Sequence, residues 1–216
     1  LRRVIYLLPK IAIRKNKYQD LSKIHQSIPT QYLPREFRNS SYTNYFIFQA
    51  RNLSSMDAEK YFLELYAEQV SMDNQTPQQK KITIDRYVQL IKLYENRQPK
   101  ENEQKLKNIL KKTLAHFRSN TTSTKDIKDF QYYLWKYTDL NASSNDIDDF
   151  WKAISEIREK RMNTNDSLRY IRKLEEYRDL RCKLKDWENV TQLDLELINL
   201  GKKIPDLIKT KTEIEA

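Results

Sequence analysis

The sequence predicts an all-α fold, and three observations lead to that prediction. Only one of the 216 residues is glycine, and six are proline. Tight hairpins and phosphate-binding loops depend on glycine, which adopts positive φ at no steric cost. Charged residues make up 32% of the chain, and apolar residues recur along it at the spacings of three and four that are typical of amphipathic helices. We therefore expect a multi-helix bundle or two helical lobes, and not a Rossmann fold, a P-loop protein or a β-sandwich.

The charge distribution predicts where two lobes divide. Residues 1–118 contain 22 Lys and Arg against 11 Asp and Glu, whereas residues 119–216 contain 18 against 19. The change coincides with a stretch made only of Ser, Asn and Thr. A basic half favours an anionic partner, and a solvated surface is the simpler alternative. The expected parts are a basic arm at 1–16, a basic helical lobe at 17–118, a linker at 119–124 and a near-neutral helical lobe at 125–216.

The N-terminal arm is apolar and basic, with no acidic residue before Asp20. We expect Pro9 to interrupt any continuous helix there, because proline lacks the backbone N–H and clashes with the preceding turn. Three interpretations stay open: an arm that binds RNA or a neighbouring subunit, a segment packed inside the protein, and a segment on a membrane surface. A short amphipathic helix is expected next, at 17–28, and Pro29 ends it.

The middle of the chain predicts further helices after a proline-containing connector and an aromatic-rich stretch at 37–50. Ser54 is expected to cap a helix that runs to about residue 72, with Asp57 completing a variant of the capping box. Thr76 and Pro77 mark another helix start, because proline is preorganised for the first helical position. The segment 101–118 begins with acidic and ends with basic side chains, as the helix dipole favours.

Residues 126–157 predict a helical hairpin with an aromatic core. Two aromatic-rich segments with helical spacing flank a polar break at 141–145. Ser144 or Asn145 is the expected N-cap of the second helix. The side chains expected to be buried together are Trp135, Phe150 and Trp151.

The last 50 residues predict an antiparallel, coiled-coil-like helical pair. A long helix capped by Asn163 or Thr164 carries apolar residues at spacings of three and four up to Trp187. A final helix is expected from Thr191, with Gly201 just beyond its end. The face proposed to bind protein partners consists of Leu174, Tyr177, Leu184 and Trp187.

No motif in the sequence indicates catalysis or a bound metal. His25 and His116 form no HxxxH or HExxH pair, and no serine lies in a GxSxG motif. Asp146, Asp148 and Asp149 fall in the first turn of a predicted helix, where acidic side chains stabilise the dipole. We therefore expect no catalytic residue, metal, cofactor or small-molecule substrate. No apolar run is long enough for a transmembrane helix.

Basic and aromatic side chains alternate through residues 32–60, a mixture that suits RNA. Aromatic rings stack on unpaired bases while Arg and Lys hold phosphates. The alternative is that Phe37, Phe46 and Phe48 belong to the hydrophobic core. No RRM, KH, zinc-finger or homeodomain signature is present, so shape and charge would govern recognition. The residues proposed to contact RNA are Arg2, Arg3, Arg14, Lys15, Lys17, Arg35, Arg38 and Arg51.

One short helix carries a distinctive set of residues, namely Tyr18, Leu21, Ile24, His25, Ile28 and Pro29. Together with Asp57-Ala58-Glu59 at the start of a later helix, this set resembles the LYR-motif mitochondrial assembly proteins of the succinate dehydrogenase assembly factor 3 type. Lys17 and Gln19 stand where that family has Leu and Arg. The resemblance covers residues 17–66. It implies a matrix protein of three helices that docks acyl carrier protein or an iron–sulfur subunit.

These patterns favour a non-enzymatic structural or adaptor subunit of a larger ribonucleoprotein assembly, such as a mitochondrial ribosome-like particle, with RNA bound by the basic half. The alternative is a protein–protein adaptor or LYR-like assembly factor without RNA contact. Cys182, read as a buried thiol, is the only cysteine and allows no disulfide framework. A reducing compartment is therefore expected, with the mitochondrial matrix favoured over the nucleus or cytoplasm.

Overall fold

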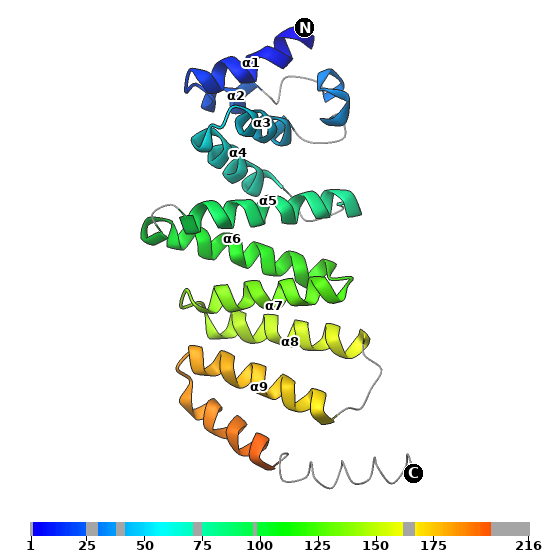
Figure 1. Ribbon diagram of the computed structural model, residues 1–216, viewed down its shortest axis with the longest axis vertical. Coiled ribbons are helices and arrows are strands. Elements are labelled where there is room, and N and C mark those ends of the chain that lie inside the picture. The colour runs from blue at the N-terminus through cyan, green and yellow to red at the C-terminus, as the bar shows by residue number, and fades with distance from the viewer. Residues whose placement is uncertain are drawn as a thin grey trace. The chain divides into compact units, whose positions relative to one another are not determined.

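The computed structural model describes residues 2–24, 30–37, 42–70, 75–96, 99–161 and 167–199 of the chain. Helices and short connections make up these residues, and none of them lies in a β-strand (Figure 1). The prediction of an all-α, multi-helix fold is therefore confirmed. The chain divides into two compact units, Leu1–His116 and Phe117–Ala216, which we call the N-terminal unit and the C-terminal unit.

The N-terminal unit begins with helix α1 (Arg2–Arg14), which packs against α2 (Gln19–Ile24) and α3 (Tyr42–Asn52). The interruption expected at Pro9 was wrong, because Pro9 lies inside α1. Its ring is buried one turn from Ile5 and Ile13, which are also buried. Packing of this face offsets the backbone hydrogen bond that proline cannot donate. The expected arm is thus a packed helix.

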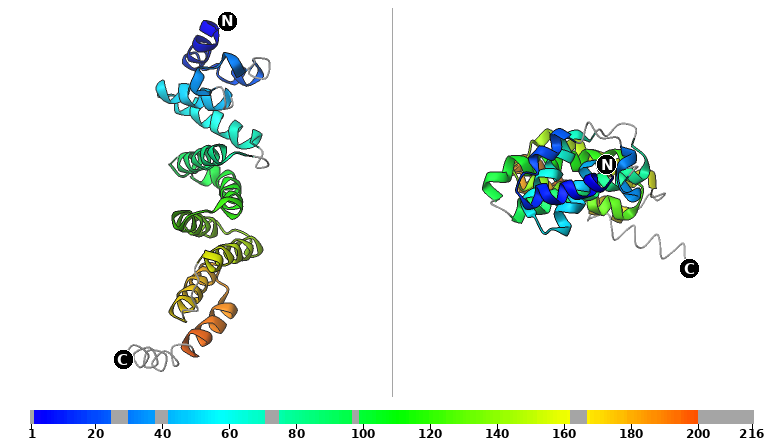
Figure 2. Two further views of the ribbon diagram at one scale, coloured as in Figure 1. Left: turned by 90° about the vertical axis from the view of Figure 1, so that its right-hand side faces the viewer. Right: turned by 90° about the horizontal axis from the view of Figure 1, so that it is seen from above.

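Two 3₁₀ turns and two further α-helices follow in this unit. The 3₁₀ turns η2 (Thr30–Tyr32) and η3 (Arg35–Phe37) lie between α2 and α3 in the sequence. Helix α4 (Met56–Gln69) packs against both α3 and α5 (Pro77–Asn96). Helices α3 and α4, coloured cyan, lie side by side in Figure 2.

The core of the N-terminal unit is rich in aromatic rings. Tyr42, Tyr45 and Phe46 of α3 are buried. The ring of Phe46 packs on that of Phe62 in α4, with centroids 5.2 Å apart. The core interpretation therefore holds for Phe46, whereas Phe48 on the same helix is exposed.

Several helices of this glycine-poor chain are followed by a residue other than glycine in the left-handed conformation. Within the described residues, Asn16, Ser54, Asn141 and Lys185 have positive φ, and each follows a helix. Ser54 is an example: its N–H and that of Ser55 donate to the carbonyls of Arg51 and Ala50, the pattern of a Schellman motif. The prediction that Ser54 caps the next helix was therefore wrong. Ser55 occupies that position, without a side-chain capping bond.

The helix start predicted at Thr76 and Pro77 is confirmed. The Gln79 N–H donates to Thr76 Oγ1 over 3.3 Å, and the Thr76 N–H donates to Gln79 Oε1 over 2.8 Å. This is a reciprocal capping box. Helix α6 (Pro99–Asn120) then runs past the division between the units at His116. Only residues 121–123 connect it to the next helix, so much of the expected linker 119–124 is helical.

The described part of the C-terminal unit contains the helices α7 (Thr124–Thr138), α8 (Ser144–Arg161) and α9 (Ser167–Lys183), and a further helix at residues 187–199. Ser123 and Asp126 form a capping box at the start of α7. Helices α7 and α8 pack on each other, and α9 packs on α7. The predicted hairpin is therefore present, but its expected N-cap was wrong: α8 begins at Ser144 itself, so Ser143 is in the N-cap position in place of Ser144 or Asn145.

The aromatic core of this unit agrees with the prediction for two of three residues. Phe150 and Trp151 are buried. The Phe150 ring packs edge-on against Phe130, with centroids 6.2 Å apart, and Trp151 stacks on Tyr177 of α9, with centroids 5.6 Å apart. Trp135 is only half-buried and lies under the Lys183 ammonium, 4.5 Å from the ring centroid.

The C-terminal helical pair differs from expectation at its turn. Lys185 adopts φ 57°, which ends α9 at Lys183 and lets the next helix begin at 187. Trp187 therefore starts the final helix and does not continue the long one. The predicted caps Asn163, Thr164 and Gly201 lie outside the described residues.

Candidate nucleic-acid interface

The residues proposed to contact RNA divide into three groups. The side chains of Arg14, Lys15, Lys17 and Arg35 are exposed. Arg14 is the last residue of α1, Lys15 and Lys17 follow it, and Arg35 lies in η3. The side chains of Arg2, Arg3 and Arg38 lie outside the described part of the structure. Arg51 forms the third group, because it is bound within the protein.

Arg51 connects three helices of the N-terminal unit. Its Nε donates to the Glu59 carboxylate of α4 over 2.6 Å, and its guanidinium also donates to Gln89 Oε1 of α5. The ion pair and the second hydrogen bond already use guanidinium donors that a bidentate contact to a phosphate would need. We therefore leave Arg51 out of the candidate interface.

A cavity of about 330 Å³ opens between α1, η3 and α3, next to the exposed cations of α1. We call it the α1–α3 pocket. Among the described residues, its lining contains two cations and no acidic side chain. The lining residues that matter below are Tyr6, Lys10, Arg14, Phe37, Phe48 and Gln49.

Aromatic rings form one wall of the α1–α3 pocket. Phe37 of η3 packs on Phe48 with centroids 5.3 Å apart and on buried Tyr45 with centroids 5.2 Å apart. Phe48 is 43% exposed and Tyr6 is 48% exposed. Of the aromatic stretch at 37–50, Phe48 thus has a ring face open to a ligand, whereas Tyr42, Tyr45 and Phe46 are buried.

The cations around the α1–α3 pocket extend from the C-terminal half of α1. Lys10 Nζ lies 4.2 Å above the Tyr6 ring centroid, in cation–π contact. Arg14 lines the pocket one turn later, and the exposed Lys15 and Lys17 follow. No acidic residue precedes Asp20 in the sequence, so this stretch of the chain is strongly basic.

Gln49 is the functional candidate that the sequence analysis missed. It lies on α3, is only 2% exposed, and lines the α1–α3 pocket. Its side-chain oxygen Oε1 accepts no hydrogen bond from the described residues. A signal was present, because Gln49 lies one and two turns beyond buried Tyr45 and Tyr42. That spacing puts a polar amide on the buried face of an aromatic helix.

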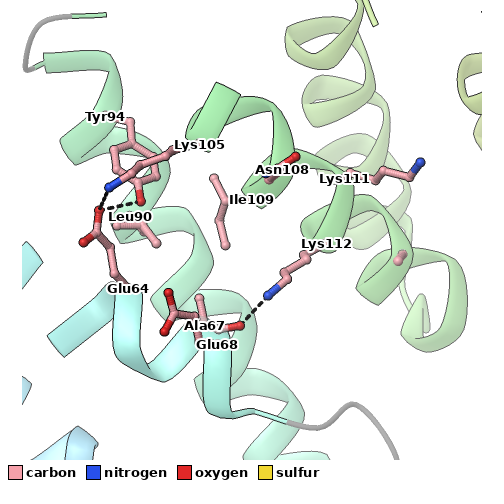
Figure 3. A pocket seen from close by; sticks show the side chains of 11 residues that line it. Glu64, Ala67, Glu68, Leu90, Tyr94, Lys105, Asn108, Ile109, Lys111 and Lys112 are labelled. Carbon is pink, nitrogen blue, oxygen red and sulfur yellow. Dashed lines mark hydrogen bonds and ion pairs between the residues drawn. The ribbon is translucent and has the colours of Figure 1, made fainter. Parts of the chain in front are cut away.

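A second cavity, of about 540 Å³, lies between α4, α5 and α6 (Figure 3). Glu64 accepts hydrogen bonds from Tyr94 over 2.9 Å and from Lys105 over 3.1 Å. Lys112 donates to the backbone carbonyl of Ala67 over 2.5 Å. Burial and the Glu64 hydrogen bond raise the pKa of Tyr94, which keeps its hydroxyl protonated as the donor. The polar groups of this cavity therefore hold the three helices together.

The residues proposed to bind protein partners are not all available. Leu174 is buried, and Tyr177 stacks on Trp151 and donates to Asp148 over 3.2 Å. Leu184 is half-buried. Trp187, in contrast, is 62% exposed.

The acidic cluster of α8 binds side chains of its own unit. Asp146 accepts a hydrogen bond from Tyr137 over 2.9 Å, and Asp148 accepts from Tyr177 and Arg181. Within the described residues no group of three or more His, Cys, Asp or Glu is arranged to hold a metal ion. Cys182 is half-buried, and not buried as expected.

The residues of the LYR resemblance that are described include Tyr18 and Leu21. Tyr18 packs on Tyr61 and Phe62 of α4, with centroids 5.5 and 6.1 Å apart, and Leu21 is buried. His25, Ile28 and Pro29 lie outside the described residues.

No described helix is both long and apolar enough to cross a membrane. No protein-family model, no curated protein and no solved structure matches this chain.

Proposed function

We propose that this chain is a non-enzymatic structural or adaptor subunit of a ribonucleoprotein assembly, and that its N-terminal unit binds single-stranded RNA. One observation carries the proposal. Among the described residues that line it, the α1–α3 pocket combines exposed aromatic rings with two cations and no acid, and further exposed cations follow the end of α1. Proteins that bind single strands combine a basic groove for the phosphates with aromatic rings for the bases.

The charge distribution supports the same assignment. The excess of Lys and Arg belongs to residues 1–118, and residues 119–216 are close to neutral. An organellar, ribosome-like particle is our preferred setting, because its subunits are basic helical proteins that contact RNA. The single cysteine is consistent with a reducing compartment, and the mitochondrial matrix is favoured.

The proposal is tested by the salt dependence of RNA binding. Each phosphate contact contributes about 0.7 to the slope of log K against log salt for single strands. Replacing Arg14, Lys15 and Lys17 with Gln should therefore reduce the slope by about 2, since it removes three contacts. We would measure fluorescence anisotropy of a labelled single-stranded RNA between 50 and 200 mM salt.

A matched control removes the same charge from the C-terminal unit. Lys125, Lys128 and Lys152 are exposed on α7 and α8, and their replacement with Gln should leave the slope nearly unchanged. Equal effects of the two triple variants would show that only net charge matters. Failure of the parent protein to bind RNA even at 50 mM salt would refute RNA binding.

A second candidate function is a protein–protein adaptor without RNA, of which an LYR-like assembly factor is one form. The observation that favours it is an apolar row on the final helix, where Trp187, Leu195 and Ile198 are all more than half exposed. Solvent-exposed apolar side chains in a row are typical of interaction surfaces. The absorbance ratio at 260 and 280 nm of the native complex distinguishes the two functions, because only a ribonucleoprotein contains nucleic acid.

A further inference from the structure

We propose that the α1–α3 pocket holds one unpaired nucleobase of the bound RNA, with the Gln49 amide hydrogen-bonded to the edge of that base. The inference rests on the proposed function and assigns a specific role to one cavity. Its starting point is the buried Gln49 side chain, which lines the pocket while its Oε1 accepts no hydrogen bond from the described residues.

Two other buried polar side chains of α3 show how such groups are satisfied in this unit. Thr43 and Asn44 are buried too. Thr43 Oγ1 donates to Gln69 Oε1 over 3.2 Å, and Asn44 Oδ1 accepts from Arg86 over 2.9 Å. Buried polar groups are normally satisfied in this way, since an unmet acceptor is costly. An unmet amide oxygen on a residue that lines a cavity therefore points to a ligand that supplies a donor.

The pocket has the shape and chemistry of a nucleobase site. Its volume of about 330 Å³ is at the lower end of the usual range for small-ligand sites. The rings of Phe37 and Phe48 offer apolar faces, and stacking on such faces tolerates any base. A glutamine amide presents an acceptor beside a donor, which matches the adjacent donor and acceptor on a base edge.

The charges explain why the base would belong to a polynucleotide. Lys10 and Arg14 line the pocket, and no acidic side chain that the structure describes is in its lining. Both cations lie on α1, and exposed Lys15 and Lys17 continue the positive charge beyond the pocket. A base in the pocket thus places its own phosphate, and the phosphates that follow, along a basic path.

The test uses the full chain with Gln49→Leu and Phe48→Ala, and three labelled RNAs of equal length. These are an unpaired strand, a strand with abasic positions and a fully paired hairpin. Each variant should weaken binding of the unpaired strand about tenfold, because each removes one contact to a base. The salt slope should stay unchanged, since no phosphate contact is lost. The abasic and paired RNAs should bind the parent and the variants equally.

The Gln49→Leu variant separates binding from folding. Leucine fills a similar volume without an unmet acceptor, so the thermal midpoint should stay the same or rise. Weaker binding at an unchanged midpoint supports a base contact. If both variants bind the unpaired strand as the parent does, the pocket holds no base while RNA binding stands on its salt slope.

Two further outcomes would overturn the inference. Absence of RNA binding by the parent at low salt removes it together with the proposed function. Equal affinity of the parent for a mononucleotide and for the unpaired strand would show that the pocket serves a free nucleotide and not RNA.

Discussion

Replacing Trp151 with alanine should destabilise the C-terminal unit by about 3–5 kcal/mol, the usual cost of removing a large core aromatic. Trp151 is 6% exposed, and its ring lies nearly parallel to that of Tyr177, with an angle of 15° between the two planes. The substitution therefore opens a cavity between α8 and α9 and also removes a stacked pair. At a urea dependence of roughly 2 kcal/mol/M, the midpoint should fall by about 2 M.

The other tryptophans provide matched controls and a selective assay. All three tryptophans lie in the C-terminal unit, so their fluorescence reports unfolding of that unit alone. Trp187→Ala should change the unfolding free energy by less than about 0.5 kcal/mol, because this side chain is exposed. Half-buried Trp135 should give an intermediate loss. A loss below about 1 kcal/mol for Trp151→Ala, or equal losses at all three positions, would contradict the packing described here.

Three further predictions concern stability. Ser123→Ala should cost about 1 kcal/mol in chemical denaturation, since it breaks the capping box with Asp126. Arg181→Ala should cost about 2 kcal/mol by the same measurement, because the buried guanidinium pairs with partly exposed Asp148. Burial lowers the pKa of His116, so the folded protein binds a proton less readily than the unfolded chain. Its contribution to stability is therefore present above about pH 6.5 and lost as the pH falls. The drop in thermal midpoint between pH 7 and pH 5 should shrink in His116→Gln.

Local features of the fold followed directly from the sequence. The single glycine and the helical spacing of apolar residues predicted the all-α class, because these depend on backbone preference and on neighbours within one or two turns. The start of α5 at Thr76 and Pro77 was predicted for the same reason, since a capping box involves residues three apart. The hairpin of α7 and α8 also follows from two apolar faces and a short polar break.

The properties of individual side chains required the tertiary structure. The sequence does not show that Arg51 of α3 donates hydrogen bonds to Glu59 and Gln89 on two other helices. Arg51 was therefore grouped with the cations proposed to bind RNA. Pro9 is tolerated in α1 because its ring packs within the N-terminal unit, a contact that local propensity does not contain. Left-handed Lys185 likewise moved Trp187 onto a new helix, although lysine gives no signal for such a turn.

The candidate site shows the same division. The sequence identified Arg14, Lys15 and Lys17 within a basic stretch and Arg35 among alternating basic and aromatic residues, because such patterns can be read from the order of residues alone. The sequence did not separate exposed Phe48 from buried Phe46. Aromatic residues lie on several sides of this helix, so their spacing does not show which side faces the core. The sequence-based prediction also missed Gln49, whose importance comes from burial without a hydrogen-bond partner. The burial of a side chain and its hydrogen-bond partners depend on residues that are distant in the chain, and only the packing of the helices brings those residues together.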